Sequence, residues 1–485
     1  MQRYLVPIGL LLLLFATRSA AIEVLPLHND EGLHLTRAVE VWNLNPFWEI
    51  RDGKVINHWL IALFYPQNAP VFTGRIATVF VAMLGGAAAY RFGRDQVGYW
   101  GGVFAITLWT AAPPLLFYER TALSDAEAGA WAMIAWWLAN RALRRDRLWL
   151  SFASGLAIGI AALFKLTALP FALGLAIFVL LEARLQLRRC LLLLMMMAFA
   201  VILCLLPPTL WLALRGQTYE IAFGWLARQG AGSSGIAANL ITNPSRLFET
   251  FTGYGTLFWA IVLMFTCLIA IWRVPRLCII WCVPTLAIIA LGTDAMPRHF
   301  ITALPWLLAL VGCGMAIALH RLRAKLSGIV VIMLLVAGLI PTAYLTHRSP
   351  EMLALPVRDI EQFISGHPSG YGLREAAHYI QTLRVASEVL FIASMFPDSC
   401  RRANFYASNH RQLMCINAAE SEQHLQSALE EYSLAYVLAE PPPIGLDVAT
   451  VSQHLNAEAT LLQTFPRPRF GAGLQLWLVR SKAFN

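Results

Sequence analysis

The chain has 485 residues, of which 58% are hydrophobic and only 13% are charged, and its mean hydropathy is +0.59. A soluble domain is about half apolar and a quarter charged, so this composition excludes an ordinary soluble protein and indicates a polytopic membrane protein. The net charge of +9 does not indicate a nucleic-acid partner, because the basic residues form short clusters between apolar runs rather than a basic stripe with aromatic residues.

Apolar runs follow one another from the N-terminus to about residue 346. A bilayer core needs about 20 apolar residues in a helix, and on that rule we predict about eleven spans. They lie at 4–22, 71–90, 99–118, 124–141, 148–164, 166–182, 191–213, 253–272, 277–292, 300–319 and 326–346. The first run is either a retained helix or a signal peptide, since Arg3, the leucines and the small residues 19–21 suit both.

Arginine and lysine clusters occupy alternate connections between these runs. Cytoplasmic loops are rich in both residues, so the pattern places the N-terminus in the cytoplasm. The inside connections carry Arg91 and Arg94, then Arg141, Arg144, Arg145 and Arg147, then Arg184, Arg188 and Arg189, then Arg273 and Arg276, then Arg321, Arg323 and Lys325. We therefore expect a multi-pass protein of the plasma membrane (the inner membrane of a bacterium) whose residues 347–485 lie outside, in the periplasm or extracellular space.

Two of the expected outside connections are long. Residues 23–70 contain helix-like stretches at 33–42 and 57–64. Residues 214–252 contain a glycine-rich stretch at 230–235, a composition typical of a flexible segment. Both belong to a predicted transmembrane domain, residues 1–346.

Residues 347–485 change in character and predict a small soluble α/β domain. We expect a helix over 374–383 and strands over 388–393, 434–438 and 474–479. Cys400 and Cys415 lie in this domain. Outside the cytosol they can form a disulfide, and two free thiols are the equal alternative. The predicted fold class is thus an all-α polytopic membrane protein with a small C-terminal α/β domain.

Three acidic residues are candidate catalytic groups. Asp30 and Glu31 follow the first apolar run, and Asp125 opens a later one. Acids near membrane depth are costly and tend to be functional. The plainer alternatives are that Asp30 and Glu31 are solvated loop acids, and that Asp125 caps a helix together with Ser124.

Several cations are expected on the same outer side. Lys54, Lys165 and Arg298 are candidates for binding a phosphate, since a helix start beside an arginine suits an anion. The alternatives are a lysine that snorkels to the interface and an arginine that anchors a helix there. Further candidates for substrate binding are His34, Arg37, His58, Arg120 and His299.

These residues together resemble a known family. Asp30-Glu31 after the first helix, Gly53-Lys54 before His58-Trp59-Leu60, the segment Glu119–Asp125, the Lys165 turn and Pro297-Arg298-His299-Phe300 are similar to motifs of GT-C integral-membrane glycosyltransferases. The order resembles the branch with protein O-mannosyltransferases and the bacterial lipid A aminoarabinose transferase. The resemblance covers roughly residues 1–345.

The resemblance implies an inverting transferase. It would move a hexosyl or pentosyl group from a polyprenyl-phosphate carrier to a lipid, glycan or protein of the cell envelope, such as lipopolysaccharide. Asp30 is the expected general base, with Glu31 and Asp125 orienting the reacting groups, and the cations would stabilise the lipid phosphate. These acids do not demand a divalent metal, although one can be accommodated. The alternative function is a transporter or lipid flippase with an external domain. We also expect Asp30 and Asp125 to line one outward-facing cavity.

Overall fold

The computed structural model describes the chain with several short gaps. The described residues are 2–64, 69–182, 186–222, 233–254, 257–291, 296–321, 325–383, 390–394, 397–406, 414–416, 420–432, 434–442, 445–469 and 471–482. The expected glycine-rich segment 230–235 lies partly outside them, since its description begins at Ser233.

The chain forms two compact units. We call one the membrane unit; it comprises Met1–Ile22, Arg37–Asn68 and Phe72–Pro356. We call the other the C-terminal unit; it comprises Glu23–Thr36, Ala69–Val71 and Val357–Asn485. The segment that carries Asp30 and Glu31 therefore groups with the C-terminal part of the chain.

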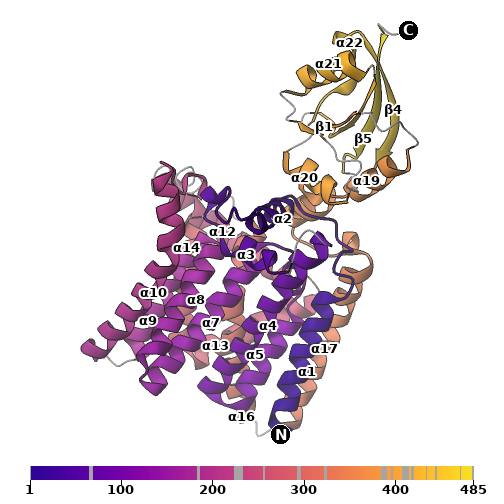
Figure 1. Ribbon diagram of the computed structural model, residues 1–485. Helices are drawn as coiled ribbons and strands as arrows, with labels where there is room; N and C mark the ends of the chain where they lie inside the picture. The colour runs from indigo at the N-terminus through magenta and orange to yellow at the C-terminus, as the bar shows by residue number, and fades with distance from the viewer. Residues whose placement is uncertain are drawn as a thin grey trace. The chain divides into compact units, whose positions relative to one another are not determined.

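The membrane unit is helical, with long helices that run side by side and a few short ones (Figure 1). They are α1 (Gln2–Ser19), α3 (Ile56–Ala62), α4 (Pro70–Val97), α5 (Tyr99–Ala111), α6 (Pro113–Tyr118), α7 (Ser124–Arg145), α8 (Leu148–Phe164), α9 (Leu169–Glu182), α10 (Leu187–Leu214), α12 (Ser233–Thr252), α13 (Leu257–Arg273), α14 (Pro275–Leu291), α15 (Pro297–Ile301), α16 (Leu304–Arg321) and α17 (Lys325–Arg348). Helix α2 (Asn29–Trp42) passes from the C-terminal unit into this one.

Each predicted span overlaps one or two helices, but the predicted number of membrane crossings is not confirmed. Among the described residues, three helices are both long and apolar enough to cross a membrane: Pro70–Val97, Leu187–Leu214 and Gly328–Arg348. A fourth crossing results if Leu263–Arg273 and Pro275–Ala290, bent by 119°, count as one span. Helices inside the bundle contact protein rather than lipid, so they can be shorter or carry charges, as α7 does with Asp125 and Glu127.

The helices approach one another closely through small residues. A Cβ on Gly312 of α16 would lie 2.6 Å from the backbone nitrogen of Ala105 on α5, and one on Gly85 of α4 would lie 2.7 Å from the Cβ of Ala130 on α7. Small residues at such crossings allow backbones into van der Waals contact in a lipid environment.

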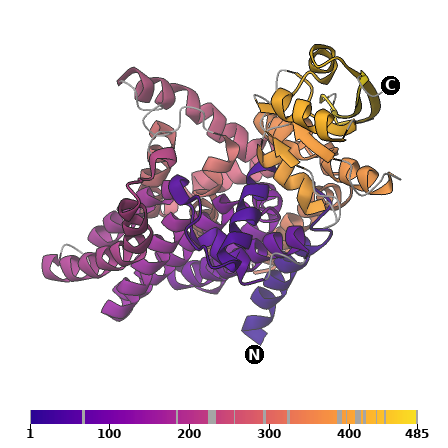
Figure 2. The same ribbon diagram turned by 45° about the horizontal axis from the view of Figure 1, so that its top comes forward.

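At one edge of the unit, α8, α9 and α10 lie side by side in both views (Figures 1 and 2).

The connection expected to be a flexible loop contains a helix. α12 is fastened by two side chains: Asn239 Nδ2 donates to the carbonyl of Ala290 (3.0 Å), and Asn243 Nδ2 donates to that of Ile289 (2.8 Å). These carbonyls belong to the last turn of α14, where no intrahelical partner exists. The asparagine side chains of α12 therefore donate to the free carbonyls of α14, whereas glycine has no side chain that could do so.

The C-terminal unit is a three-layer α/β domain. Its sheet has the order β2-β1-β3-β5-β4, formed by β1 (Leu390–Ser394), β2 (Met414–Ile416), β3 (Leu434–Ala439), β4 (Ala457–Phe465) and β5 (Leu474–Ser481). β1 pairs in parallel with β2 and β3, whereas β5 is antiparallel to β3 and β4. The helices are α18 (Val357–Ile360), α19 (Leu373–Thr382), α20 (Pro397–Tyr406), α21 (Ser421–Tyr432) and α22 (Val448–His454).

The two faces of the sheet bury different helices. Tyr436 and Leu438 of β3 pack with α19 and α20, and Ala435 and Val437 pack with α21 and α22. This alternation follows from the two-residue period of a strand. The helix predicted over 374–383 and the strands predicted near 388–393, 434–438 and 474–479 are confirmed within the described residues, whereas β2, β4, α18, α20, α21 and α22 were not predicted. Cys400 and Cys415 form a disulfide.

Candidate functional site

A buried ion pair lies at the start of α7. Lys165 Nζ donates to Asp125 Oδ1, and the two side chains are 14% and 5% exposed. Asp125 is in the first turn of α7, and Lys165 occupies the extended turn that joins α8 to the 3-10 helix η2 (Leu166–Ala168). The structure thus brings together two of the residues proposed from the sequence.

The loop before α3 is docked onto the same turn. The backbone N–H of Val55 donates to the carbonyl of Leu163 (2.7 Å). Gly53 has a φ of 80°, and a Cβ there would lie 2.5 Å from Cδ1 of Leu166. Only glycine combines this left-handed conformation with so close an approach. The docked loop carries Lys54 toward Lys165.

Asp52 pairs with Lys54 of this loop and with Arg37 of α2, and it was not predicted as a site residue. Its oxygens accept hydrogen bonds from Arg37 Nη1 at 3.1 and 3.0 Å, and one lies 3.6 Å from Lys54 Nζ. Arg37 Nη1 also lies 3.5 Å from Nε2 of the buried His58. Burial alone would raise the pKa of Asp52, but the charges of Lys54 and Arg37 lower it below its ordinary value. The sequence signal was only that Lys54 follows Asp52 by two residues.

The charges around Lys165 affect its protonation. Burial lowers the pKa of Lys165 to about 8, while Asp125 raises it and the positive charges of Arg298 and Lys54 lower it further. Lys165, Lys54 and Arg298 are therefore electrostatically coupled. With Arg37, four cations are grouped with two carboxylates, Asp52 and Asp125, which leaves an excess of positive charge for an anionic ligand.

Arg298 and His299 lie on α15, which has only five residues. His299 Nδ1 accepts from the backbone N–H of Met296 (3.3 Å), so this histidine stabilises the start of the helix. A macrodipole needs several aligned turns, so the helix end adds little to anion binding here. The contribution of this segment is chiefly the charge of Arg298.

The acid pair Asp30-Glu31 lies in the first turn of α2, within the C-terminal unit. Glu31 is buried, and its Oε2 accepts from the backbone N–H of His28 (2.9 Å), which is the reciprocal bond of a capping box. Asp30 is only half-buried. His34, on the same helix, is fully buried. The two adjacent acids therefore differ: one caps the helix and the other is the more accessible. The expectation that Asp30 and Asp125 share a cavity stays a prediction.

Among the residues that the structure describes, no group of three or more His, Cys, Asp or Glu side chains is arranged to hold a metal ion.

Comparison with known proteins gives the fold. The family model described as dolichyl-phosphate-mannose-protein mannosyltransferase matches residues 55–211, which include Asp125 and Lys165. The solved structure of ArnT from Cupriavidus metallidurans in the apo state has a TM-score of 0.62 at 14% identity, and the likeness covers 98% of this chain and 97% of that one. The chain has the GT-C glycosyltransferase fold.

Two further GT-C structures are similar. ArnT from the same organism bound to undecaprenyl phosphate has a TM-score of 0.58 at 14% identity, with 97% of each chain covered. The oligosaccharyltransferase of Archaeoglobus fulgidus in the apo form has a TM-score of 0.52 at 12% identity, with 90% of this chain and 69% of that one covered. Comparison with the sequences of curated proteins gave no match. The apolar helices and this GT-C fold make the chain a multi-pass membrane protein.

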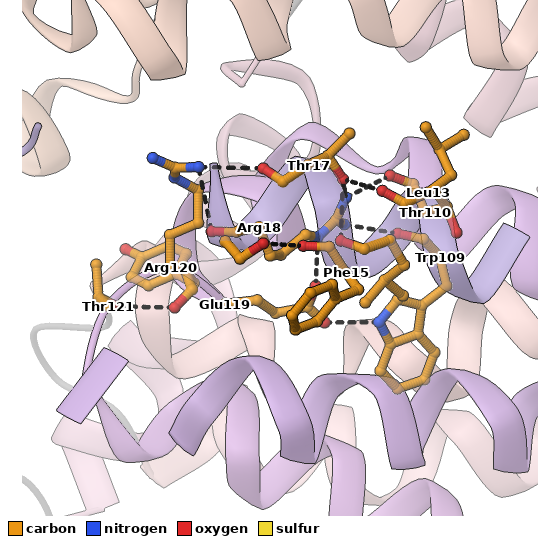
Figure 3. Close-up of polar contacts among 12 residues, drawn as sticks. Leu13, Phe15, Thr17, Arg18, Trp109, Thr110, Glu119, Arg120 and Thr121 are labelled. Atoms are coloured by element: carbon orange, nitrogen blue, oxygen red, sulfur yellow. Dashed lines mark hydrogen bonds and ion pairs between the residues drawn. The ribbon is translucent and has the colours of Figure 1, made fainter. Parts of the chain in front are cut away.

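The Glu119-Arg120 dipeptide contacts α1 (Figure 3). Arg18 Nε donates to Glu119 Oε2 (2.9 Å), and Trp109 Nε1 donates to Glu119 Oε1 (2.6 Å). The guanidinium of Arg120 donates to the carbonyls of Thr17, Arg18, Ala20 and Ala21. The carbonyls of Thr17 and Arg18 belong to the last turn of α1 and lack helical partners, and those of Ala20 and Ala21 belong to the turn that follows. Arg120, predicted as a substrate ligand, thus caps α1 in this structure, and α1 is an integral part of the membrane unit.

Proposed function

We propose that the chain is an inverting glycosyltransferase that moves a sugar from a polyprenyl-phosphate carrier to an acceptor hydroxyl on the outer face of the plasma membrane. The observation that carries the proposal is the group of Lys54, Lys165 and Arg298 around buried Asp125, because such an excess of positive charge suits a lipid phosphate. The GT-C fold supports it, since one neighbour with this fold was solved with undecaprenyl phosphate bound.

The reaction divides the roles among these residues. The acceptor oxygen attacks the anomeric carbon, and its proton passes to a carboxylate, for which we propose Asp30 because Glu31 is occupied in capping α2. The bond between the sugar and the phosphate oxygen breaks as the glycosidic bond forms. The lipid phosphate leaves with the bonding electrons, and its negative charge is stabilised by Lys165, Lys54 and Arg298.

Asp125 holds the cation Lys165 and does not accept the proton of the acceptor hydroxyl. As the buried partner of Lys165, it holds the ammonium group in place. A lysine placed in a low-dielectric site without such a partner would lose its proton more readily. We therefore assign Asp125 a positioning role, with His58 and Arg37 holding the neighbouring loop through Asp52.

The disulfide supports the proposed topology. Disulfides persist in oxidising compartments and are rare in the cytosol. Cys400–Cys415 therefore supports a C-terminal unit in the periplasm or extracellular space, and with it a cytoplasmic N-terminus. The acceptor class, whether envelope lipid, glycan or protein, follows from the resemblance alone.

The test uses purified protein in detergent with a radiolabelled polyprenyl-phosphate sugar and an envelope extract as acceptor. We expect label in the acceptor fraction with wild type and none with Asp30→Asn, which should still reach the membrane. Glu23→Gln, at an exposed acid of the same segment, is the matched control and should keep full activity. Full activity of Asp30→Asn would refute the assignment of the base, and the absence of any transfer by wild type would refute the function.

A further inference from the structure

Two side chains of α20 in the C-terminal unit bind the backbone of the segment that leads into Asp30. The backbone N–H of Leu27 donates to the hydroxyl of Tyr406 (2.9 Å), and the carbonyl of Leu27 accepts from Nη1 of Arg402 (3.0 Å). Both polar groups of this buried residue are therefore satisfied by side chains almost 380 positions away in sequence. A buried peptide group without such partners would be costly.

Arg402 connects this segment to a second one. Its fully buried guanidinium also donates to the carbonyls of Pro368 (2.8 Å) and His367 (3.1 Å). The turn that follows approaches Leu27 directly, since a Cβ on Gly370, whose φ is 77°, would lie 2.3 Å from the carbonyl oxygen of Leu27. The segment thus has defined contacts on two sides.

A histidine extends the contact to the backbone of Asp30 itself. The N–H of Asp30 donates to His28 Nδ1 (3.1 Å), so in the neutral ring the proton resides on Nε2. That N–H then donates to Oε1 of Gln362 (3.1 Å). The ring of His28 also packs on Phe363, with centroids 4.6 Å apart. Gln362 and Phe363 lie on a short π-helical segment, Glu361–Ser365.

We propose that Arg402, Tyr406 and Gln362 are positioning residues for Asp30, and that this is the task of the C-terminal unit. The inference rests on the proposed function, because it takes Asp30 as the general base. A misplacement of about 1 Å can cost about a hundredfold in rate, so a base on a surface segment needs such support. The disulfide joins the chain of contacts to the sheet, since Cys400 lies on α20 and Cys415 on β2.

Two substitutions test the contacts without loss of volume: Tyr406→Phe removes the acceptor for Leu27 N–H, and Gln362→Met removes the acceptor for His28. Hydrogen exchange of the full-length protein is measured on the peptide covering residues 23–36. We expect exchange there to become about fivefold faster in each variant, the change that one lost hydrogen bond implies. We also expect kcat to fall about tenfold, with the KM for the lipid donor within about twofold of wild type.

Asp447→Ala is the matched control in the same unit. Asp447 caps α22, where its side chain accepts from the backbone N–H of Thr450 (3.2 Å), so its removal destabilises the domain without touching the segment before Asp30. An unchanged exchange rate at 23–36 in Tyr406→Phe and Gln362→Met would overturn the inference. So would an equal loss of kcat in Asp447→Ala, because the effect would then be general instability. Exchange needs no turnover, so it decides the inference even if wild type transfers no sugar.

Discussion

The buried pair Arg18–Glu119 provides the sharpest test of the membrane unit, because its effect does not depend on the proposed activity. Arg18 donates to Glu119, to the hydroxyl of Thr17 and to the carbonyls of Trp109 and Thr110, at 2.8 to 3.1 Å. The side chains of the pair are 0% and 1% exposed. Arg18→Met keeps most of the volume but leaves an acid buried without its cation.

The size of the effect follows from this burial. Removing one partner of a buried ion pair costs about 3–5 kcal/mol, because the remaining charge is uncompensated. For a unit of this size about 1 kcal/mol shifts Tm by about 2 °C, so we expect a fall of about 6–10 °C at pH 8. Burial raises the pKa of Glu119 even with Arg18 present. Glu119 therefore takes up a proton readily in the variant, and the defect should shrink as the pH falls, by at most about 1.4 kcal/mol per unit.

The assay uses cysteines that the chain already carries. Cys190 and Cys313 are free and buried in helices of the membrane unit. Once the accessible thiols, such as exposed Cys282, are blocked in the folded protein, a thiol-reactive fluorescent dye reports the exposure of these two on heating. Arg51→Met is the matched control, because Arg51 pairs with Glu220 on the surface, where the side chains are 41% and 51% exposed. Such a pair contributes at most about 1 kcal/mol.

Two results would refute the reasoning. One is a Tm shift in Arg18→Met no larger than that in Arg51→Met. The other is a double variant, Arg18→Met with Glu119→Gln, that is no more stable than Arg18→Met alone, because neutralising the acid should remove the uncompensated charge.

Two further predictions concern the site and the C-terminal unit. Because the pKa of Lys165 is about 8, its charge is lost as the pH rises through that value, so kcat/KM for the lipid donor should fall about tenfold per unit above it. Lys165→Arg, which stays charged, should flatten this alkaline limb, and an unchanged limb would contradict the assignment. Replacing Cys400 and Cys415 by serine opens a link with a sequence separation of 15, so the free energy of unfolding of the C-terminal unit should fall by about 3 kcal/mol in a calorimetric melt. Reductant should lower the free energy of unfolding of this unit in wild type by the same amount, whereas Cys204→Ser should leave it unchanged.

Much of the helical architecture could be predicted from the sequence. Runs such as 71–90 and 191–213 are helical because a bilayer leaves no other way to satisfy the backbone, so local composition suffices. The acid Asp125 and the cation Lys165 were found for a similar reason, since a charge between apolar runs is costly unless it has a partner. The strands β3 and β5 were visible as short apolar runs.

What each polar residue contacts was decided only by the tertiary structure. Asp52 was not singled out in the sequence, and it holds Arg37 and Lys54. Arg120 looked like a ligand for substrate, and it caps α1. Asp30 lies in the first turn of α2, in a segment that belongs with residues nearly 380 positions later. Hydropathy is a sum over neighbouring residues, whereas a hydrogen bond depends on which distant segments pack together, and no local pattern encodes that choice.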